Sequence, residues 1–232
     1  MKDRSYIVTH AAQPVARDIA RALAERGARV YALAFPGEGE IPFGIPCRAD
    51  GYGPGEIGRA LDRADSVDGI VNTALFRHTS RLTETGEAEW KSVVDSVVKG
   101  AYYATGFAVR RMCESGRGGS VVNIGTYEWK YGFKDSTLFA SACGALHTLS
   151  AYVSRAYADR GIRSNWISLP RIGADVRGDR DAFFARAYPK GARVPGQKDV
   201  VSAALFLLSD EGAALTGSNL ECTAGYGYPL NV

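Results

Sequence analysis

Residues 6–35 read YIVTHAAQPVARDIARALAERGARVYALAF, and they predict a strand, a helix and a second strand in succession. Residues 6–9 are a short apolar run typical of a buried strand, and residues 28–35 are another. Between them, residues 14–26 carry apolar side chains at helical spacing, namely Val15, Ile19, Ala22 and Leu23. Strand, helix and strand in this order form the unit from which parallel sheets are built.

The same alternation continues to the end of the chain. Residues 36–46 are rich in Pro and Gly and predict a loop. The further helices are predicted at residues 55–64, 87–114, 136–160 and 198–208, and the further strands at 69–72, 120–124, 163–168 and 219–223. Because such alternation with right-handed crossovers gives a parallel sheet with helices on both faces, we expect one doubly wound, Rossmann-like α/β domain over residues 1–232, with about seven strands.

The composition is that of an ordinary globular protein, with 46% apolar and 23% charged residues. The 28 basic and 25 acidic residues are interspersed without a basic stripe, so the net charge of +3 gives nucleic-acid binding no support. No apolar run is long enough to cross a bilayer and no signal-peptide pattern is present, which predicts a cytoplasmic protein without membrane contact. The four cysteines form no C-x-x-C pair, so no metal site is predicted.

Several strings carry a resemblance over essentially the whole chain. They are Asn72-Thr73-Ala74, residues 90–100 (WKSVVDSVVKG), residues 119–124 (GSVVNI) and residues 199–217. Together they resemble the short-chain dehydrogenase/reductase family, in which the first string is Asn-Asn-Ala-Gly and the second belongs to a helix at the subunit interface. The resemblance implies a Rossmann fold, NAD or NADP as cofactor, and assembly into oligomers.

The phosphate loop of that family reads Thr-Gly-x-x-x-Gly-x-Gly, because glycines let the backbone approach the pyrophosphate at a helix N-terminus. Residues 9–16 read THAAQPVA here, so the three glycine positions are occupied by His10, Pro14 and Ala16. Pro14 has no N–H to donate, and the other two side chains fill space that phosphates need. We therefore expect that this chain binds no dinucleotide and that any NAD or NADP belongs to a partner subunit.

The residues that choose between NAD and NADP are also missing. The second strand ends at Ala34-Phe35, without the acidic or basic residue that meets the ribose or its phosphate. Asp50 and Asn72 are the residual candidates for cofactor contact, although Asp before Gly is commonly a turn former.

The catalytic tetrad of the family is Asn, Ser, Tyr and Lys, in which Tyr transfers the proton and Lys lowers its pKa. The aligned residues here are Val97, Thr126, Phe139 and Cys143, and the separations between the last three positions are those of the family. Phenylalanine cannot transfer a proton. The resemblance thus implies a degenerate member in which no catalytic residue can be assigned and which transfers no hydride by itself.

The first hypothesis for function is a non-catalytic subunit that forms a hetero-oligomer with an active, NAD(P)-dependent homologue. The resemblance implies such a role because a few family members are heteromeric, among them some acyl-thioester dehydrogenases and ketoacyl reductases. A partner of this kind retains the core and the assembly surfaces, while the phosphate-binding and proton-transfer groups are free to change. The substrate of the assembly would then be a hydroxyacyl or ketoacyl thioester.

Two alternatives stay open. The chain could be a repurposed lyase, isomerase or cyclase that works without nicotinamide in the old substrate cleft, with Thr126, Tyr127 and Glu128 as acid, base or anchor, and with His78 and His147 in reserve. It could also be a regulatory protein that binds a small molecule. Phe183, Phe184 and Tyr188 are spaced as on a helix, consistent with an apolar or aromatic ligand or with a lid packed on the core.

Overall fold

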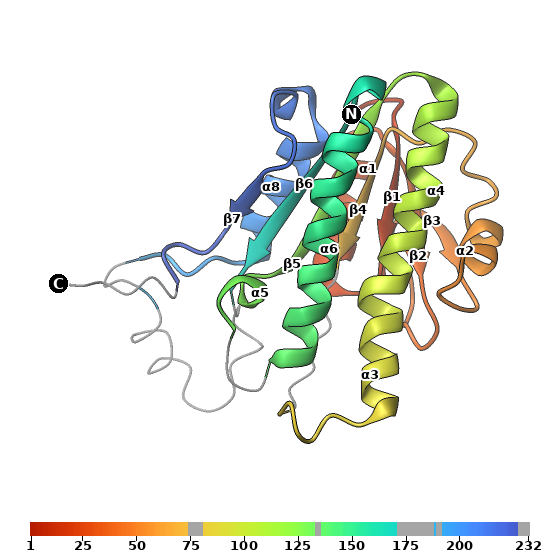
Figure 1. Ribbon diagram of the computed structural model, residues 1–232. Coiled ribbons are helices and arrows are strands. Elements are labelled where there is room, and N and C mark those ends of the chain that lie inside the picture. Colours follow the sequence, from red (N-terminus) through yellow and green to blue (C-terminus); the bar gives the residue numbers. More distant parts are fainter. Residues whose placement is uncertain (74–80, 133–135, 171–187, 189–191, 227–232) are drawn as a thin grey trace.

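In the computed structural model the chain forms a seven-stranded, all-parallel sheet, with the strands in the order β3-β2-β1-β4-β5-β6-β7 (Figure 1). The structure describes residues 1–73, 81–132, 136–170, 188 and 192–226. The strands are β1 (Ser5–Thr9), β2 (Arg29–Ala34), β3 (Ile45–Arg48), β4 (Gly69–Thr73), β5 (Gly119–Thr126), β6 (Ile162–Leu169) and β7 (Asn219–Glu221). The expected doubly wound α/β class is confirmed.

Helices cover both faces of this sheet. They are α1 (Pro14–Ala24), α2 (Pro54–Ala60), α3 (Glu87–Val93), the π-helix η1 (Val94–Lys99), α4 (Gly100–Ser115), α5 (Glu128–Tyr131), α6 (Thr137–Ala156), the 3₁₀ turn η2 (Ala158–Arg160), α8 (Gln197–Leu208) and the 3₁₀ turn η4 (Asp210–Gly212). The long helices α4 and α6 lie side by side on one face, and α1 and α8 pack on the other (Figure 1).

The alternation of side chains along the strands builds the two cores. On β1, Tyr6 and Val8 face the α1/α8 layer, whereas Ile7 faces the α2/α4 layer. Pro14 occupies the first turn of α1, where a missing N–H removes no intrahelical hydrogen bond. Gly27, at φ +77°, then turns the chain back into β2 in a conformation that residues with a Cβ rarely adopt.

Two local predictions were wrong. Residues 36–46 were expected to form a loop, but Ile45 and Pro46 begin β3. A strand tolerates Pro46 because β3 lies at the edge of the sheet, where a missing N–H breaks no ladder. The single helix expected at residues 87–114 is divided by η1, and the π-helical turn leaves no mark in the apolar spacing.

Among the described residues, no helix is both long enough and apolar enough to span a bilayer.

Candidate functional site

The candidate site lies at the carboxyl ends of β1, β4 and β5, where the strand order reverses and where ligands of doubly wound folds bind. The first two ends are joined by side chains, because Thr73 Oγ1 donates to the Thr9 carbonyl at 2.9 Å and Thr73 N–H donates to Thr9 Oγ1 at 3.2 Å. Thr126 ends β5 beside them. The candidate site comprises three segments: the loop after β1, the start of α4 and the residues after β5.

His10 fills the loop after β1. Its backbone has φ +53°, in the left-handed region that glycine enters most easily, and its side chain is only 2% exposed. The ring lies between two partners: Nδ1 forms a very short hydrogen bond with Glu38 Oε1, and Nε2 donates to the Ser96 carbonyl at 3.1 Å. Glu38 is nearly as buried as His10, with a side chain that is 6% exposed.

The hydrogen bonds give both side chains a partner. A backbone carbonyl only accepts, so Nε2 of His10 carries a proton and donates it to Ser96, while Nδ1 pairs with the Glu38 side chain. This explains how two ionisable groups share a buried position, since an unpaired buried charge is strongly destabilising.

Aromatic packing extends the filled region beyond His10. The Phe35 ring lies 4.7 Å from the His10 ring and is stacked on Tyr52 at 4.9 Å. The α4 helix closes on both rings at Gly100, where a Cβ atom would lie 3.1 Å from Phe35 and 3.2 Å from Tyr52. Burial raises the pKa of the Tyr52 hydroxyl, and the neighbouring Glu38 carboxylate adds to this shift. We call His10, Phe35, Glu38 and Tyr52 the plug.

A second filled region occupies the aligned tetrad positions. Val97, Phe139 and Cys143 lie together in one apolar cluster with Trp166 of β6, and each of them is at most 4% exposed. The indole of Trp166 and the Cys143 thiol both press on Gly125, where a Cβ would lie 2.5 Å and 3.1 Å from them. The structure brings these positions together as the alignment predicts, but as hydrophobic core.

The three residues after β5 are also packed. Thr126 is 5% exposed and Tyr127 is 1% exposed; Thr126 Oγ1 accepts the Glu128 N–H at 3.2 Å. The Glu128 carboxylate, on a residue that is 3% exposed, accepts a very short hydrogen bond from Ser136 Oγ. These hydrogen bonds hold the turn between β5 and α6 together. The proposed acid or base roles of the three residues stay predictions.

Tyrosine rings surround Tyr127. Tyr131 lies 4.8 Å away and Tyr226 lies 6.0 Å away, between ring centroids, and Tyr188 packs on Tyr226 at 5.3 Å. Burial raises the pKa of the Tyr188 hydroxyl. Tyr188 thus packs with Tyr127 and Tyr226, whereas Phe183, Phe184 and His78 lie outside the described residues.

The sequence did not single out an aromatic stack around His147. The His147 ring is stacked 4.0 Å from Trp129 and lies edge-on to Trp166 at 5.9 Å. Both indoles donate to Ser168 Oγ, at 3.3 Å and 2.9 Å. Burial lowers the pKa of His147. Only the apolar spacing of the strand pointed to Trp166, and α5, which carries Trp129, was not predicted at all.

Burial gives the cysteines a testable property. It raises the pKa of Cys143 to about 12 and that of Cys47 to about 11. At pH 8 a thiol of pKa 12 is a thiolate in a fraction on the order of 10⁻⁴, and the thiolate is the nucleophile. We expect iodoacetamide to leave Cys143 and Cys47 unmodified in the folded protein and to modify both in urea, as measured by peptide mass spectrometry. Rapid labelling of native Cys143 would contradict this environment.

Comparison with known proteins places this geometry in a family. A family model described as enoyl-(acyl carrier protein) reductase matches residues 56–227, nearly three quarters of the chain. The chain belongs to the short-chain dehydrogenase/reductase family. The matched region begins after all four plug residues, so residues 9–16 also lie outside it.

Curated relatives and solved structures agree with this membership. The 3-oxoacyl-(acyl-carrier-protein) reductase FabG of Escherichia coli is 27% identical over 94% of this chain and 95% of its own length. An uncharacterized oxidoreductase of Mycobacterium tuberculosis is 26% identical over 97% and 92%. A short-chain dehydrogenase/reductase of Mycobacterium ulcerans has the same fold, with a TM-score of 0.85 at 22% identity over 97% of this chain and 90% of that chain.

In this short-chain dehydrogenase/reductase, side chains replace the glycines of the family's phosphate loop. His10 and its partners take up the space beside the first helix, Pro14 has no N–H, and Ala16 is fully buried against the sheet. Of the residual candidates, Asn72 is 1% exposed and its amide donates to Thr105 and Asn123 at 2.8 Å and 2.9 Å. Asp50 is exposed.

Within the described ranges, no three His, Cys, Asp or Glu side chains gather as metal ligands do.

Proposed function

We propose that this chain is a non-catalytic subunit of the short-chain dehydrogenase/reductase family and associates with an active, NAD(P)-dependent homologue. The observation that carries the proposal is the apolar cluster of Val97, Phe139 and Cys143 at the tetrad positions. Among these three side chains only a buried thiol with a raised pKa can ionise. Proton transfer to a carbonyl needs a donor within hydrogen-bond reach, and this cluster offers none.

The plug supports the same conclusion from the cofactor side. A dinucleotide would have to displace the buried His10–Glu38 pair and the Phe35–Tyr52 stack before its phosphates reached α1. Each of those contacts stabilises the folded chain, so nucleotide binding would have to overcome their loss. Phosphate-binding groups are replaced at the glycine positions and proton-transfer groups at the tetrad positions. Replacement at both favours a non-catalytic scaffold over an enzyme with altered specificity.

The relatives suggest the chemistry of the active partner. Several are named 3-oxoacyl-(acyl-carrier-protein) reductases, which act on ketoacyl thioesters. The proposed assembly therefore reduces a ketoacyl thioester or oxidises a hydroxyacyl thioester, with the partner supplying nicotinamide and tetrad. The repurposed-enzyme alternative has less support, because Thr126 and Tyr127 are packed inside the protein.

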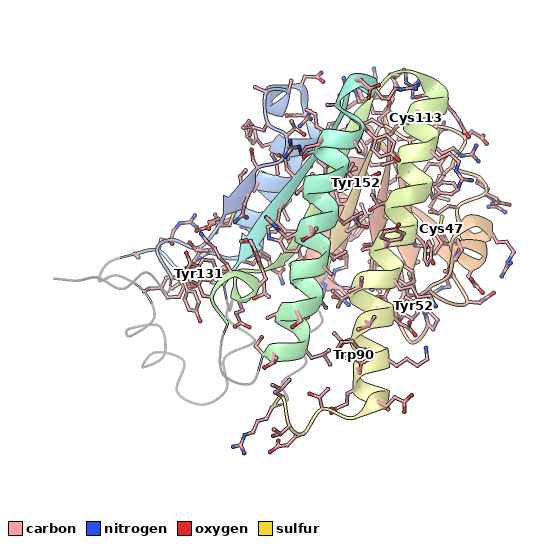
Figure 2. All side chains as sticks on the ribbon, in the orientation of Figure 1. Cys47, Tyr52, Trp90, Cys113, Tyr131 and Tyr152 are labelled. Atoms are coloured by element: carbon pink, nitrogen blue, oxygen red, sulfur yellow. The ribbon has the colours of Figure 1, made fainter. Side chains whose placement is uncertain are left out.

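The α4–α6 face is the surface that we assign to association. Figure 2 shows Tyr152 on α6, at this face; it is 61% exposed, and Tyr102 of α4 is 54% exposed. The same two helices carry Gly106 and Gly144, where a Cβ would meet no atom within 4 Å. Large rings and small residues on one helix pair give a surface that can interlock with a similar pair.

Cofactor binding is the first test. Calorimetric titration with NADH and with NADPH is expected to give no saturable heat up to millimolar concentrations, because the plug occupies the glycine positions. An active family member, titrated with the nucleotide that it uses, serves as the positive control. Saturable binding of either nucleotide in the micromolar range would contradict the proposal.

Association is the second test. Co-expression with an intact family member from the same genome is expected to yield a stable hetero-oligomer, and Tyr152→Glu should abolish it, because a carboxylate would be buried without a partner. Arg17→Glu, on the exposed side of α1, is the control and should leave assembly unchanged. Light scattering after size exclusion reports both. A homo-oligomer with turnover of its own would overturn the proposal.

A further inference from the structure

A cavity of about 310 Å³ lies outside the tetrad cluster, between the start of α3 and the start of α6. Leu82, Glu87 and Trp90 line one side of it, and Thr137, Leu138 and Ser141 line the other. Leu138 packs into the tetrad cluster and separates the cavity from it. The volume is at the lower end of the range for ligand sites, roughly 300–1,000 Å³, so it suits a small molecule.

The apolar wall of the cavity is unusually exposed. Trp90 is 56% exposed and Leu82 is 74% exposed, and both belong to the few large hydrophobic side chains that the described residues present to solvent. In Figure 2, Trp90 lies on α3 near the first turn of α6. An exposed indole at a concave site, unlike an isolated surface side chain, offers a flat face to a ligand.

The described lining of the cavity carries a negative charge. Glu87 is the one ionisable side chain among the described residues that line it, and it forms no ion pair or side-chain hydrogen bond with them. The Glu89 carboxylate accepts the Gly86 N–H at 3.2 Å, so this N–H is not offered to Glu87. Arg81, the cation next to Leu82, pairs with Glu84 at 3.2 Å.

We propose that this cavity binds a small organic ammonium ion with an apolar or aromatic body. The indole of Trp90 attracts a cation over its face, and Glu87, one helical turn earlier, supplies the counter-charge. Leu82 and Leu138 contact the apolar body, and the hydroxyls of Thr137 and Ser141 accept from the ammonium N–H groups. The site is separate from the tetrad cluster, and it does not depend on whether the chain is a subunit or an enzyme.

The probe is 2-phenylethylammonium, and 2-phenylethanol is its neutral analogue of nearly the same shape. Binding is followed by the ¹H–¹⁵N signals of the tryptophan indoles, with Trp90→Phe to assign the Trp90 signal. The chain has three tryptophans, and the other two indoles donate to Ser168, so they serve as internal references. We expect a saturable shift of the Trp90 signal with the ammonium ion and a weaker effect with the alcohol.

Variants separate the two contributions. Glu87→Gln should weaken ammonium binding roughly two- to fivefold, the scale of one exposed ion pair, and leave binding of the alcohol unchanged. Trp90→Leu should weaken ammonium binding roughly two- to tenfold, measured on a ¹³C-labelled methyl signal of Leu82. Glu114→Gln, at the far end of α4, removes the same charge and should change neither.

Three outcomes would overturn this proposal. The first is no saturable shift of the Trp90 signal, and the second is equal affinity for the ammonium ion and the alcohol. The third is a Trp90 signal that moves on dilution without ligand, because a second copy of the chain would then cover the cavity. The association test depends on Tyr152 and the cofactor test on the plug, whereas this test is read at Trp90 and Leu82, so its failure is distinguishable from theirs.

Discussion

Replacing Glu38 by alanine is expected to lower the free energy of unfolding by about 2–4 kcal/mol, the scale measured when one partner of a buried polar pair is removed. The variant leaves Nδ1 of His10 facing a void, and it also removes the acceptor of the Phe35 N–H, which lies 3.3 Å from Glu38 Oε2. His10 is held at φ +53° by these contacts, so its strained backbone loses support as well. Urea unfolding measures the loss.

Matched variants identify the cause. Glu40→Ala removes an exposed carboxylate from the same loop and should change the stability by less than about 0.5 kcal/mol. His10→Gly relieves the backbone strain, and the double variant with Glu38→Ala should lose clearly less than the two single losses added together, because the two residues are in contact. Strictly additive losses would show that the pair does not act as a unit.

The fold was predictable because its signals are local and repeated. The alternation of apolar runs and helical spacing gave the order of the elements, and the burial of Tyr6, Ile7 and Val8 on β1 follows from it directly. Two elements that were not predicted from the sequence have weak signals. β3 has only four residues and contains Pro46, and the apolar spacing of the π-helix η1 is the same as that of an α-helix.

The residues at the aligned tetrad positions were predictable from the sequence, but the residues that contact His10 and Phe35 were not. Spacing alone placed Val97, Phe139 and Cys143 at one point, and the structure brings them together. Glu38 was missed, because its role depends on a loop of unpredictable path that returns it to His10, 28 residues earlier in the chain. Tyr52 was missed for the same reason: a stack across separate loops has no periodic signal.

The two filled regions are connected through η1. Ser96 accepts from His10 with its carbonyl, and the next residue, Val97, packs beside Phe139. The π-helix therefore carries a contact of the plug and a member of the apolar cluster on adjacent residues. A change in η1 would therefore reach both filled regions.

Placing a lysine at Cys143, the position aligned with the lysine of the family's tetrad, tests how strongly this position excludes charge. Cys143→Lys is expected to lower the free energy of unfolding by about 2–4 kcal/mol at pH 7, because a cation enters a fully buried apolar position. Ala145→Lys, two residues later and exposed on the same helix, is the matched control and should change stability by less than about 0.5 kcal/mol. Chemical unfolding of the three proteins gives the comparison.

The pH dependence identifies the mechanism of that loss. Burial lowers the pKa of a lysine below its ordinary value of about 10.4, so the unfolded state binds more protons and stability rises with pH between the lowered and the ordinary pKa. The loss in Cys143→Lys should therefore shrink from pH 7 to pH 9.5, whereas Ala145→Lys shows no such trend. Glu128, whose carboxylate acts on Cys143 electrostatically, should limit the loss, and adding Glu128→Gln should increase it. A Cys143→Lys variant that is as stable as the parent, and whose Trp166 indole N–H signal is unchanged, would mean that water reaches the position of Cys143. The subunit proposal would then lose the observation that carries it.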